Sequence, residues 1–555
     1  MTAVSPPPTR PPRLTTAEWR RKRRRRPLRY LAGLVLLAAC GAAAVAAYAR
    51  FWQPVTLTGD PAALAHLELA PVGVKLESVS VTSDGVPLPV ERRQRRIWPQ
   101  RKVEAGSTLD VVVTVRRSGW LSWAAGTTAK VHLTAVAPAA HVSAPVVRIA
   151  PGHAVTVRFD TPVARATVAH GSQVARGTYA QPRRTIETDV EATRARPAGT
   201  LLVRAAPRSW ETLGPAERVS WFPPGRGVQA LVAPAESADL APTNPLVLTL
   251  SEPVARAFGS DRPAIEPAVP GRWVDVDDDT IEFRPLGAGF ALGSHVHVKL
   301  PAAVTVVSGT TRRTVRALDW HVPPGTTLRL QQLLARLGYL PLRWQPDAEP
   351  VALTARAQTQ AAIDPPAGSF DWRFPKVPAQ LSSLWHEGSW SVLVQGALMH
   401  FQHDNGLAVD GIPGPDVWRT LIHDVLTNTH NRSGYSYVLV HRNVPQTLVL
   451  YHGGKVVLTA RVNTGVAGAP TALGTWPVFE RLPVTTMSGT NPDGSHYHDE
   501  GIRWVSYFHG GEAIHGFDRA TYGYPQSVGC VEAPVATAGK IWPYTPIGTL
   551  VTITD

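Results

Sequence analysis

A short segment that occurs twice in the first half of the chain constrains the fold most. Phe159-Asp-Thr-Pro-Val-Ala-Arg-Ala166 matches Leu250-Ser-Glu-Pro-Val-Ala-Arg-Ala257, and the two copies lie ninety-one residues apart. An alternating apolar stretch precedes each copy, at 154–158 and at 246–249. Alternation with a period of two predicts β-strands, and this offset is about the length of one immunoglobulin-like β-sandwich. The repeat therefore predicts two tandem sandwiches, at 139–230 and 231–322.

The preceding region has the same character. Alternating apolar residues recur at 108–116 and 130–135, turns rich in Gly and Pro separate them, and no long helical period intervenes. We therefore expect a third sandwich of the same kind at 52–138. Since single hydrophobic cores stop growing at roughly 250–300 residues, 555 residues predict several domains, here mainly β.

The N-terminus predicts a membrane anchor. Ten of the first twenty-nine residues are Lys or Arg, and Leu31–Ala49 follow without a charge. Nineteen apolar residues suit one transmembrane helix, with a basic cytoplasmic tail at 1–30 and the rest of the chain extracytoplasmic, facing the cell wall. Two alternatives stay open, a cleaved signal peptide and a lipobox at Leu37-Ala-Ala-Cys40 that would lipidate Cys40.

The net charge of +14 does not indicate nucleic-acid binding, because most of the excess lies in that terminal block. No basic and aromatic motif follows in the body of the chain. The remaining positive charge is compatible with an anionic cell wall as partner.

A helical domain is expected at 324–428. Leu328–Tyr339 has the spacing of an amphipathic helix that ends at Gly338, a second helix is expected at 391–403, and a turn at 410–414 leads into a third. The segments Leu330-Gln-Gln-Leu, Phe401-Gln-His-Asp-Asn-Gly-Leu407 and Asp410-Gly-Ile-Pro-Gly414 resemble the small three-helix peptidoglycan-binding domain.

The last region, 433–555, is β again and contains Cys530, one of two cysteines. A cysteine nucleophile needs a base and backbone donors for the oxyanion. His515 is the candidate base, with the Gly516 carbonyl to orient its ring, and Gly529 is the candidate backbone donor together with Cys530 itself. Ser527 is expected to position the loop. The alternative is an inert cysteine near an unrelated histidine.

His515-Gly516 followed by Ser527-Val-Gly-Cys530 resembles the signature of the L,D-transpeptidase (YkuD-type) catalytic domain. This family remodels peptidoglycan through a cysteine acyl-enzyme on a mostly β fold. Two positions depart from the family pattern. Val528 stands where the family usually has His, and Glu532 stands where Arg or Asn is common. Pro267–Trp273 and Thr280–Pro285 similarly resemble the bacterial Ig-like modules that often precede this domain.

The resemblance implies cross-linking of peptidoglycan stem peptides, with Cys530 attacking the carbonyl between the diamino acid and the terminal D-Ala. Tyr507 and Trp504 are expected to line the cleft, and 486–500 to form a lid over it. Water as acceptor would instead make the domain a carboxypeptidase. A non-catalytic, membrane-anchored wall-binding protein is the alternative from another class.

No metal or other cofactor is expected. His496 and His498, with neighbouring Asp499 and Glu500, invite a zinc site, but nothing in the sequence fixes a third ligand. Four acids at 275 and 277–279 could in principle bind calcium, although a solvated turn explains them as well.

Overall fold

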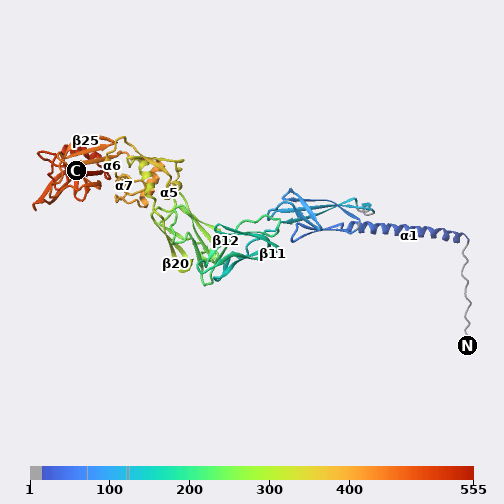
Figure 1. The fold of residues 1–555 in the computed structure, drawn as a ribbon. Coiled ribbons are helices and arrows are strands. Elements are labelled where there is room, and N and C mark those ends of the chain that lie inside the picture. Colours follow the sequence, from blue (N-terminus) through green and yellow to red (C-terminus); the bar gives the residue numbers. More distant parts are fainter. Residues whose placement is uncertain (1–15, 72, 120–121, 124–125) are drawn as a thin grey trace, which may run out of the picture. The chain divides into compact units, whose positions relative to one another are not determined.

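The computed structural model describes residues 16–71, 73–119, 122–123 and 126–555. The chain divides into two compact units, Met1–Pro224 and Gly225–Asp555 (Figure 1). The N-terminal unit begins with the helix α1, Thr16–Phe51. The first half of the expected basic tail at 1–30 lies outside the described residues. Among the helices that are described, none combines the length and hydropathy of a membrane-spanning segment.

The first β module consists of two four-stranded sheets. One has the strand order β1-β2-β6-β5 and the other β4-β3-β7-β8. Val111, Val113 and Val115 of β7 are buried, while the residues between them are more exposed, as period-two alternation predicts. The strands are β1 Val55–Gly59, β2 Ala65–Leu69, β3 Val74–Ser83, β4 Val86–Leu88, β5 Val90–Arg93, β6 Arg96–Pro99, β7 Thr108–Arg117 and β8 Thr128–Val136.

The second module is built on one five-stranded sheet with the order β11-β10-β12-β13-β9. Its strands are β9 Val146–Arg148, β10 His153–His170, β11 Gln173–Ala192, β12 Gly199–Ala206 and β13 Glu217–Phe222. The loop after β12 reaches the first module, where Trp210 joins the apolar core and donates from its indole nitrogen to the Ala62 carbonyl. The two modules of this unit therefore share a joint built around a buried tryptophan.

The third module forms a seven-stranded sheet ordered β16-β19-β14-β15-β18-β17, with β20 paired to β19. Its elements are β14 Gln229–Ala233, β15 Leu246–Leu250, α3 Val254–Phe258, β16 Ala264–Glu266, β17 Gly271–Asp277, β18 Thr280–Pro285, β19 His295–Ser308 and β20 Thr311–His321. In the second and third modules hydrogen bonding connects all strands into one sheet, whereas the expectation was of two facing sheets in each.

The two copies of the repeat fold differently. The stretch at 159–166 continues the long strand β10, whereas Val254–Phe258 in the other copy form the short helix α3. The helix begins after Pro253 and buries Val254 and Phe258, which lie four residues apart on one face. In β10 the same sequence instead pairs with β11 across irregular register. The two copies therefore adopt different local conformations, because different elements pack beside each copy.

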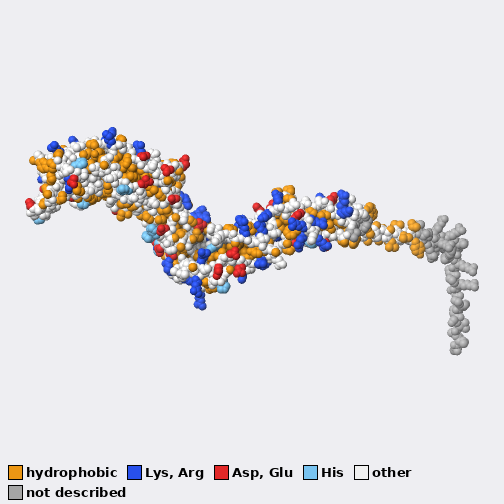
Figure 2. Space-filling model, in the orientation of Figure 1, with side chains coloured by type: hydrophobic (Ala, Val, Ile, Leu, Met, Phe, Trp, Pro, Cys, Tyr) orange, Lys and Arg blue, Asp and Glu red, His pale blue; other side chains and the backbone are white. Residues whose placement is uncertain are grey.

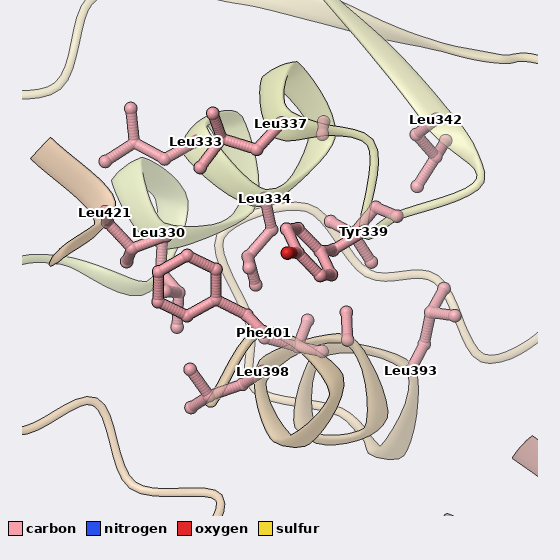
Figure 3. Packing of buried hydrophobic residues seen from close by; sticks show 14 of the residues in the cluster. Leu330, Leu333, Leu334, Leu337, Tyr339, Leu342, Leu393, Leu398, Phe401 and Leu421 are labelled. Carbon is pink, nitrogen blue, oxygen red and sulfur yellow. The ribbon is translucent and has the colours of Figure 1, made fainter. Parts of the chain in front are cut away.

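The helical domain follows at Thr326. Three of its helices begin at capping residues, since the side chains of Thr326, Thr354 and Ser391 each accept a backbone N–H from the first turn. Gly338 ends α4 in the left-handed conformation with φ 89°. Figure 3 shows Leu330, Leu334, Tyr339 and Phe401 packed between the first and the later helices. The elements are α4 Thr327–Leu337, β21 Leu342–Pro346, α5 Ala355–Ile363, β22 Gly368–Trp372, α6 Ala379–Ser382, α7 Val392–Asp404 and α8 Pro415–Thr427.

The last region contains two sheets with the orders β25-β24-β23-β31-β26 and β27-β28-β29-β30. Its elements are β23 Ser436–His441, β24 Thr447–His452, β25 Lys455–Arg461, β26 Gly474–Pro477, β27 Glu480–Thr490, β28 His496–His509, β29 Glu512–Gly516, β30 Val531–Ala533, α9 Val535–Ile541, the 3₁₀ turn η1 Trp542–Tyr544 and β31 Leu550–Thr554.

The helical domain and this region share one core. Tyr437, Leu439 and Leu550 belong to the same buried cluster as the helices. A Cβ added at Gly396 of α7 would lie 2.6 Å from the Gly548 carbonyl, and one added at Gly548 would lie 2.2 Å from the Gly396 carbonyl. Only glycine permits this close backbone approach. The two domains therefore pack as one body.

Candidate active site

The four-stranded sheet brings the two candidate catalytic residues to neighbouring strands. β29 and β30 pair in parallel, with Ile514 opposite Val531 and His515 opposite Glu532. Cys530 immediately precedes β30, so this register places it beside Ala513. Because alternate residues share a face of a sheet, Cys530 and His515 lie on the same face, roughly 8 Å apart along the diagonal between their Cα atoms.

His515 is held as a neutral base. Its side chain is buried, and Nδ1 lies 3.3 Å from the carbonyl oxygen of Gly516. A carbonyl can only accept, so this contact assigns the proton to Nδ1 and leaves Nε2 free to accept one. Burial lowers the pKa of His515 below its ordinary value. The imidazole is therefore uncharged at neutral pH and able to take up a proton.

Gly516 allows close packing at this point because it has no side chain. A Cβ at this position would lie 2.9 Å from the Cα of Val535, at the start of α9. The glycine thus lets α9 pack directly against β29, which fixes the carbonyl that orients His515.

Cys530 is half-buried, and its thiol lies 3.7 Å from the carbonyl oxygen of Gly511. It packs against an apolar cluster that includes Val505 and Ala513. Burial raises the pKa of the Cys530 thiol to about 12. The resting thiol is therefore neutral, and it needs a base at the moment it attacks.

The loop before Cys530 is tied down by hydrogen bonds. The Ser527 hydroxyl donates to the carbonyl oxygen of Cys530 at 2.6 Å, and the Ser527 N–H donates to the Thr464 carbonyl at 3.1 Å. Gly529 has φ +104°, a conformation that residues with a side chain rarely adopt. Ser527 and Gly529 thus set the path of the backbone that carries Cys530.

An ion pair that sequence reasoning missed lies next to His515. Arg519 donates to both carboxylate oxygens of Glu532, at 2.9 and 2.8 Å, and also to the carbonyl of Gln526 at 3.3 Å. Glu532 is buried, and its charge acts to raise the pKa of His515 while that of Arg519 acts to lower it. Glu532, noted only as a departure from the family pattern, is thus compensated by an arginine within the chain.

The guanidinium of Arg519 also completes an aromatic contact. Its carbon lies 4.5 Å from the centre of the Phe517 ring, and that ring meets His515 edge to face at 6.1 Å. The ion pair therefore influences His515 both through its charges and through the packing of Phe517.

The two aromatic residues expected in the cleft lie on opposite faces of β28. Tyr507 packs against the same apolar cluster as Cys530, and burial and then the Cys530 side chain raise its pKa. The same two causes raise the pKa of Tyr497, which the sequence had not singled out. Trp504, in contrast, packs against Trp542 at 5.9 Å between ring centres and belongs to the core on the other side. Tyr507 is therefore the aromatic residue that shares an apolar cluster with Cys530, whereas Trp504 belongs to the other core.

The stretch expected to be a lid is a hairpin. β27 and β28 pair from Glu480 opposite Tyr507 to Thr490 opposite His496. The histidines considered for zinc lie on it, with His496 bonded to Thr490 at 3.1 Å and His498 near Glu500 at 3.4 Å. In the described part of the chain, no three His, Cys, Asp or Glu side chains are grouped so that they could hold a metal ion.

Comparison with known proteins identifies the two C-terminal domains. Residues 435–553 match the family model described as the L,D-transpeptidase catalytic domain, and residues 387–421 match that of a putative peptidoglycan-binding domain. No curated protein matches the chain.

Solved structures similar to the chain include three L,D-transpeptidases. The catalytic domain from E. faecium is 26% identical, covers 21% of this chain and 95% of its own, and has a TM-score of 0.20. The enzyme from Mycobacterium smegmatis is 12% identical over 60% of this chain and 100% of its own, with a TM-score of 0.20. L,D-transpeptidase 3 from Mycobacterium tuberculosis, with a faropenem-derived adduct, is 13% identical over 58% and 97%, with a TM-score of 0.19. At such TM-scores the family model, not superposition, carries the assignment.

Proposed function

Because residues 435–553 are an L,D-transpeptidase catalytic domain, a cysteine-dependent enzyme, we propose that this chain cross-links peptidoglycan stem peptides through an acyl-enzyme on Cys530. The donor is a stem peptide that ends in a diamino acid followed by D-Ala. The acceptor is an amine of a second stem. The steps below assign each event to a residue of the site.

Acylation begins with the Cys530 thiol and the His515 imidazole both uncharged. Nε2 of His515 takes the thiol proton as the sulfur of Cys530 attacks the carbonyl carbon between the diamino acid and D-Ala. The N–H groups of Gly529 and Cys530 stabilise the negative charge that develops on the carbonyl oxygen. The protonated His515 then gives its proton to the departing amine of D-Ala, and a thioester remains on Cys530.

Transfer of the acyl group from Cys530 to the acceptor uses the same two residues in the reverse direction. The amine of the second stem attacks the thioester carbon, and His515 accepts a proton from that amine. The sulfur leaves as a thiolate, which the protonated His515 reprotonates, so that the neutral pair is restored. Water in place of the amine would give hydrolysis at the same site.

One observation carries this proposal. The Nδ1 contact with the Gly516 carbonyl leaves Nε2 as the proton acceptor, on a strand paired with the segment that follows Cys530. A thiol with a pKa of about 12 gains little from its own ionisation, so a positioned neutral base is what the chemistry requires.

The test uses purified disaccharide-tetrapeptide as donor and acceptor, with products identified by mass spectrometry. We expect cross-linked dimers from the full-length chain and none from Cys530→Ala. Tripeptide monomers alone would show a carboxypeptidase. No product, together with no mass increase after exposure to a carbapenem, would leave a non-catalytic wall-binding protein.

We propose further that the helical domain contacts peptidoglycan. A cavity of about 350 Å³ in this domain is lined by residues that include the half-exposed Trp390, Gln395 and Asp410. An aromatic face with amide and carboxylate groups suits a sugar chain, because the ring covers apolar C–H groups and the polar groups bind hydroxyls.

For the N-terminal part, we propose that the chain is held at the membrane and that Ig-like modules separate the anchor from the enzyme. The support is the basic block followed by the uncharged stretch Leu31–Ala49, and the succession of β modules. Protease added to intact spheroplasts should digest residues 51–555. Protection of that region would contradict the proposal.

A further inference from the structure

The positive charge of the exported region is concentrated in the second β module. Residues 139–230 contain twelve arginines, no lysine and six acidic residues. The third module has the opposite balance, with eight basic and eleven acidic residues at 231–322. The first module, 52–138, has a smaller excess, with ten basic and seven acidic residues. The larger excess in the second module, supplied by arginine alone, points to a local binding function.

The strand register gathers three of these arginines on one face of the sheet. Thr167 of β10 lies opposite Arg176 of β11 and opposite Arg204 of β12. Two strand spacings therefore separate Arg176 from Arg204, roughly 10 Å between their Cα atoms. Arg165 lies two residues before Thr167 on the same strand, and so on the same face. The residues between, such as Ala166 and Val168, point into the core.

In the described part of the chain, no carboxylate neutralises these three guanidinium groups. Arg165 donates to the Glu211 carbonyl at 3.1 Å, and Arg204 to the Gly214 carbonyl at 2.8 Å. Both acceptors are backbone oxygens without a net charge. Among the residues that the structure describes, neither of these arginines nor Arg176 forms a salt bridge with a carboxylate. The contacts with carbonyl oxygens orient the guanidinium groups of Arg165 and Arg204 and leave their positive charge available to a ligand.

A cavity of about 530 Å³ lies over this face, lined by the three arginines, Thr167, Val174 and Leu202 among others. On the same face, the next cross-strand row is apolar and consists of Val174, Ala169 and Leu202. The Val174 side chain is 57% exposed and the Leu202 side chain 44%. A row of guanidinium groups thus adjoins a row of exposed apolar side chains. Figure 2 shows Lys and Arg side chains in blue over the stretch that Figure 1 labels β11 and β12.

We propose that this arginine face, formed by Arg165, Arg176 and Arg204, binds a linear polyol phosphate, a polymer whose phosphodiester groups alternate with a carbon backbone. The planar guanidinium groups fit phosphate oxygens, and the apolar row can contact the C–H groups of the polyol units between successive phosphates. A phospholipid surface carries the same phosphodiester chemistry, so the test compares the two sources.

The test measures binding of the full-length chain to poly(glycerol phosphate) by titration at several salt concentrations. In one variant the three arginines are replaced by Gln. A matched control replaces Arg158, Arg194 and Arg196, which are exposed in the same module and do not line the cavity, so that both variants lose the same charge. The basic N-terminal segment is present in both and contributes equally.

We expect the variant of the arginine face to bind poly(glycerol phosphate) roughly tenfold more weakly, as the loss of three partly solvated charge contacts predicts. It should also show a shallower salt dependence. The control variant should stay within about twofold of the parent. Replacement of the three arginines by Lys should recover only part of the loss, because Lys keeps the charge but lacks the fork.

Three outcomes would overturn the proposal. Equal loss in both Gln variants would show that only net charge matters. Unchanged binding in the variant of the arginine face would exclude the face as the site. Loss of binding to phosphatidylglycerol vesicles without loss of polymer binding would assign the face to a lipid surface. Circular dichroism of both variants checks that the module remains folded.

Discussion

The pair Arg519–Glu532 offers the sharpest test of the site. In Arg519→Leu, Glu532 loses two charge-assisted hydrogen bonds and stays buried among the strands that carry His515 and Cys530. Removing one partner of a buried ion pair costs about 3–5 kcal/mol. Since the Arg519 side chain is 31% exposed, water can reach the pair, and we expect the lower end, about 3 kcal/mol.

Hydrogen–deuterium exchange can measure this loss locally, which matters in a chain of several domains. A loss of about 3 kcal/mol corresponds to roughly a hundredfold faster exchange of amides in β29 and β30, if these open as one unit. Arg419→Leu is the matched control, because Arg419 pairs with Asp416 on the surface, with side chains 66% and 73% exposed. An exposed ion pair contributes at most about 1 kcal/mol. The amides of α8, which carries this pair, should therefore exchange less than about fivefold faster in the control variant than in the parent.

Removal of the carboxylate as well, in Arg519→Leu with Glu532→Leu, should restore much of the protection, because no unpaired charge then remains buried. The pH dependence of acylation gives a second, independent measurement. Without Arg519, the charge of Glu532 favours the imidazolium unopposed, so the pKa of His515 should rise and the acid limb of acylation should move to higher pH. If Arg519→Leu left both exchange and the acid limb as in the parent, the pair would have no role at the site.

Four further predictions concern single residues. Alkylation of Cys530 by iodoacetamide should keep rising with pH beyond 10 without a plateau near neutrality, because burial raises the thiol pKa to about 12; a plateau below pH 8 would contradict this. His515→Ala should slow acylation by a carbapenem roughly 10²–10⁴-fold in stopped-flow measurements, whereas Ser527→Ala should cost far less; equal losses would remove the distinction between base and positioning residue. Trp210→Ala should destabilise the first module by about 3–5 kcal/mol, seen as faster exchange in β7, although Trp210 lies between β12 and β13 of the second module; unchanged exchange would refute the shared joint. Trp390→Ala should weaken co-sedimentation with purified peptidoglycan while leaving carbapenem acylation of Cys530 intact, and undiminished sedimentation would exclude this cavity.

Local patterns predicted the elements well where chemistry and packing are local. The helix that ends at Gly338 and the alternating strand at 108–116 were both confirmed, since a left-handed cap and period-two burial are set by neighbouring residues. The family assignment was likewise accessible from the motif around Cys530 and His515, which lies within the matched residues 435–553.

Other features depend on partners distant in sequence. The different conformations of the two repeat copies were not predictable from the sequence, because β11 lies beside one copy and a turn beside the other. Trp504 could not be told from Tyr507 by residue type, since only the strand's orientation decides which one faces Cys530. The Arg519–Glu532 pair spans thirteen residues and a parallel strand pairing, although the unusual acid at 532 was the signal that something must balance it.

The close approach of Gly396 and Gly548 limits how this protein can be dissected or recombined. A fragment beginning at residue 435, where the family match begins, would strip the helices from Tyr437, Leu439 and Leu550. Uncovering three large apolar side chains costs roughly 5 kcal/mol or more, a large fraction of a domain's net stability. A fusion or truncation boundary therefore does not belong between the helical and the catalytic domain of this chain.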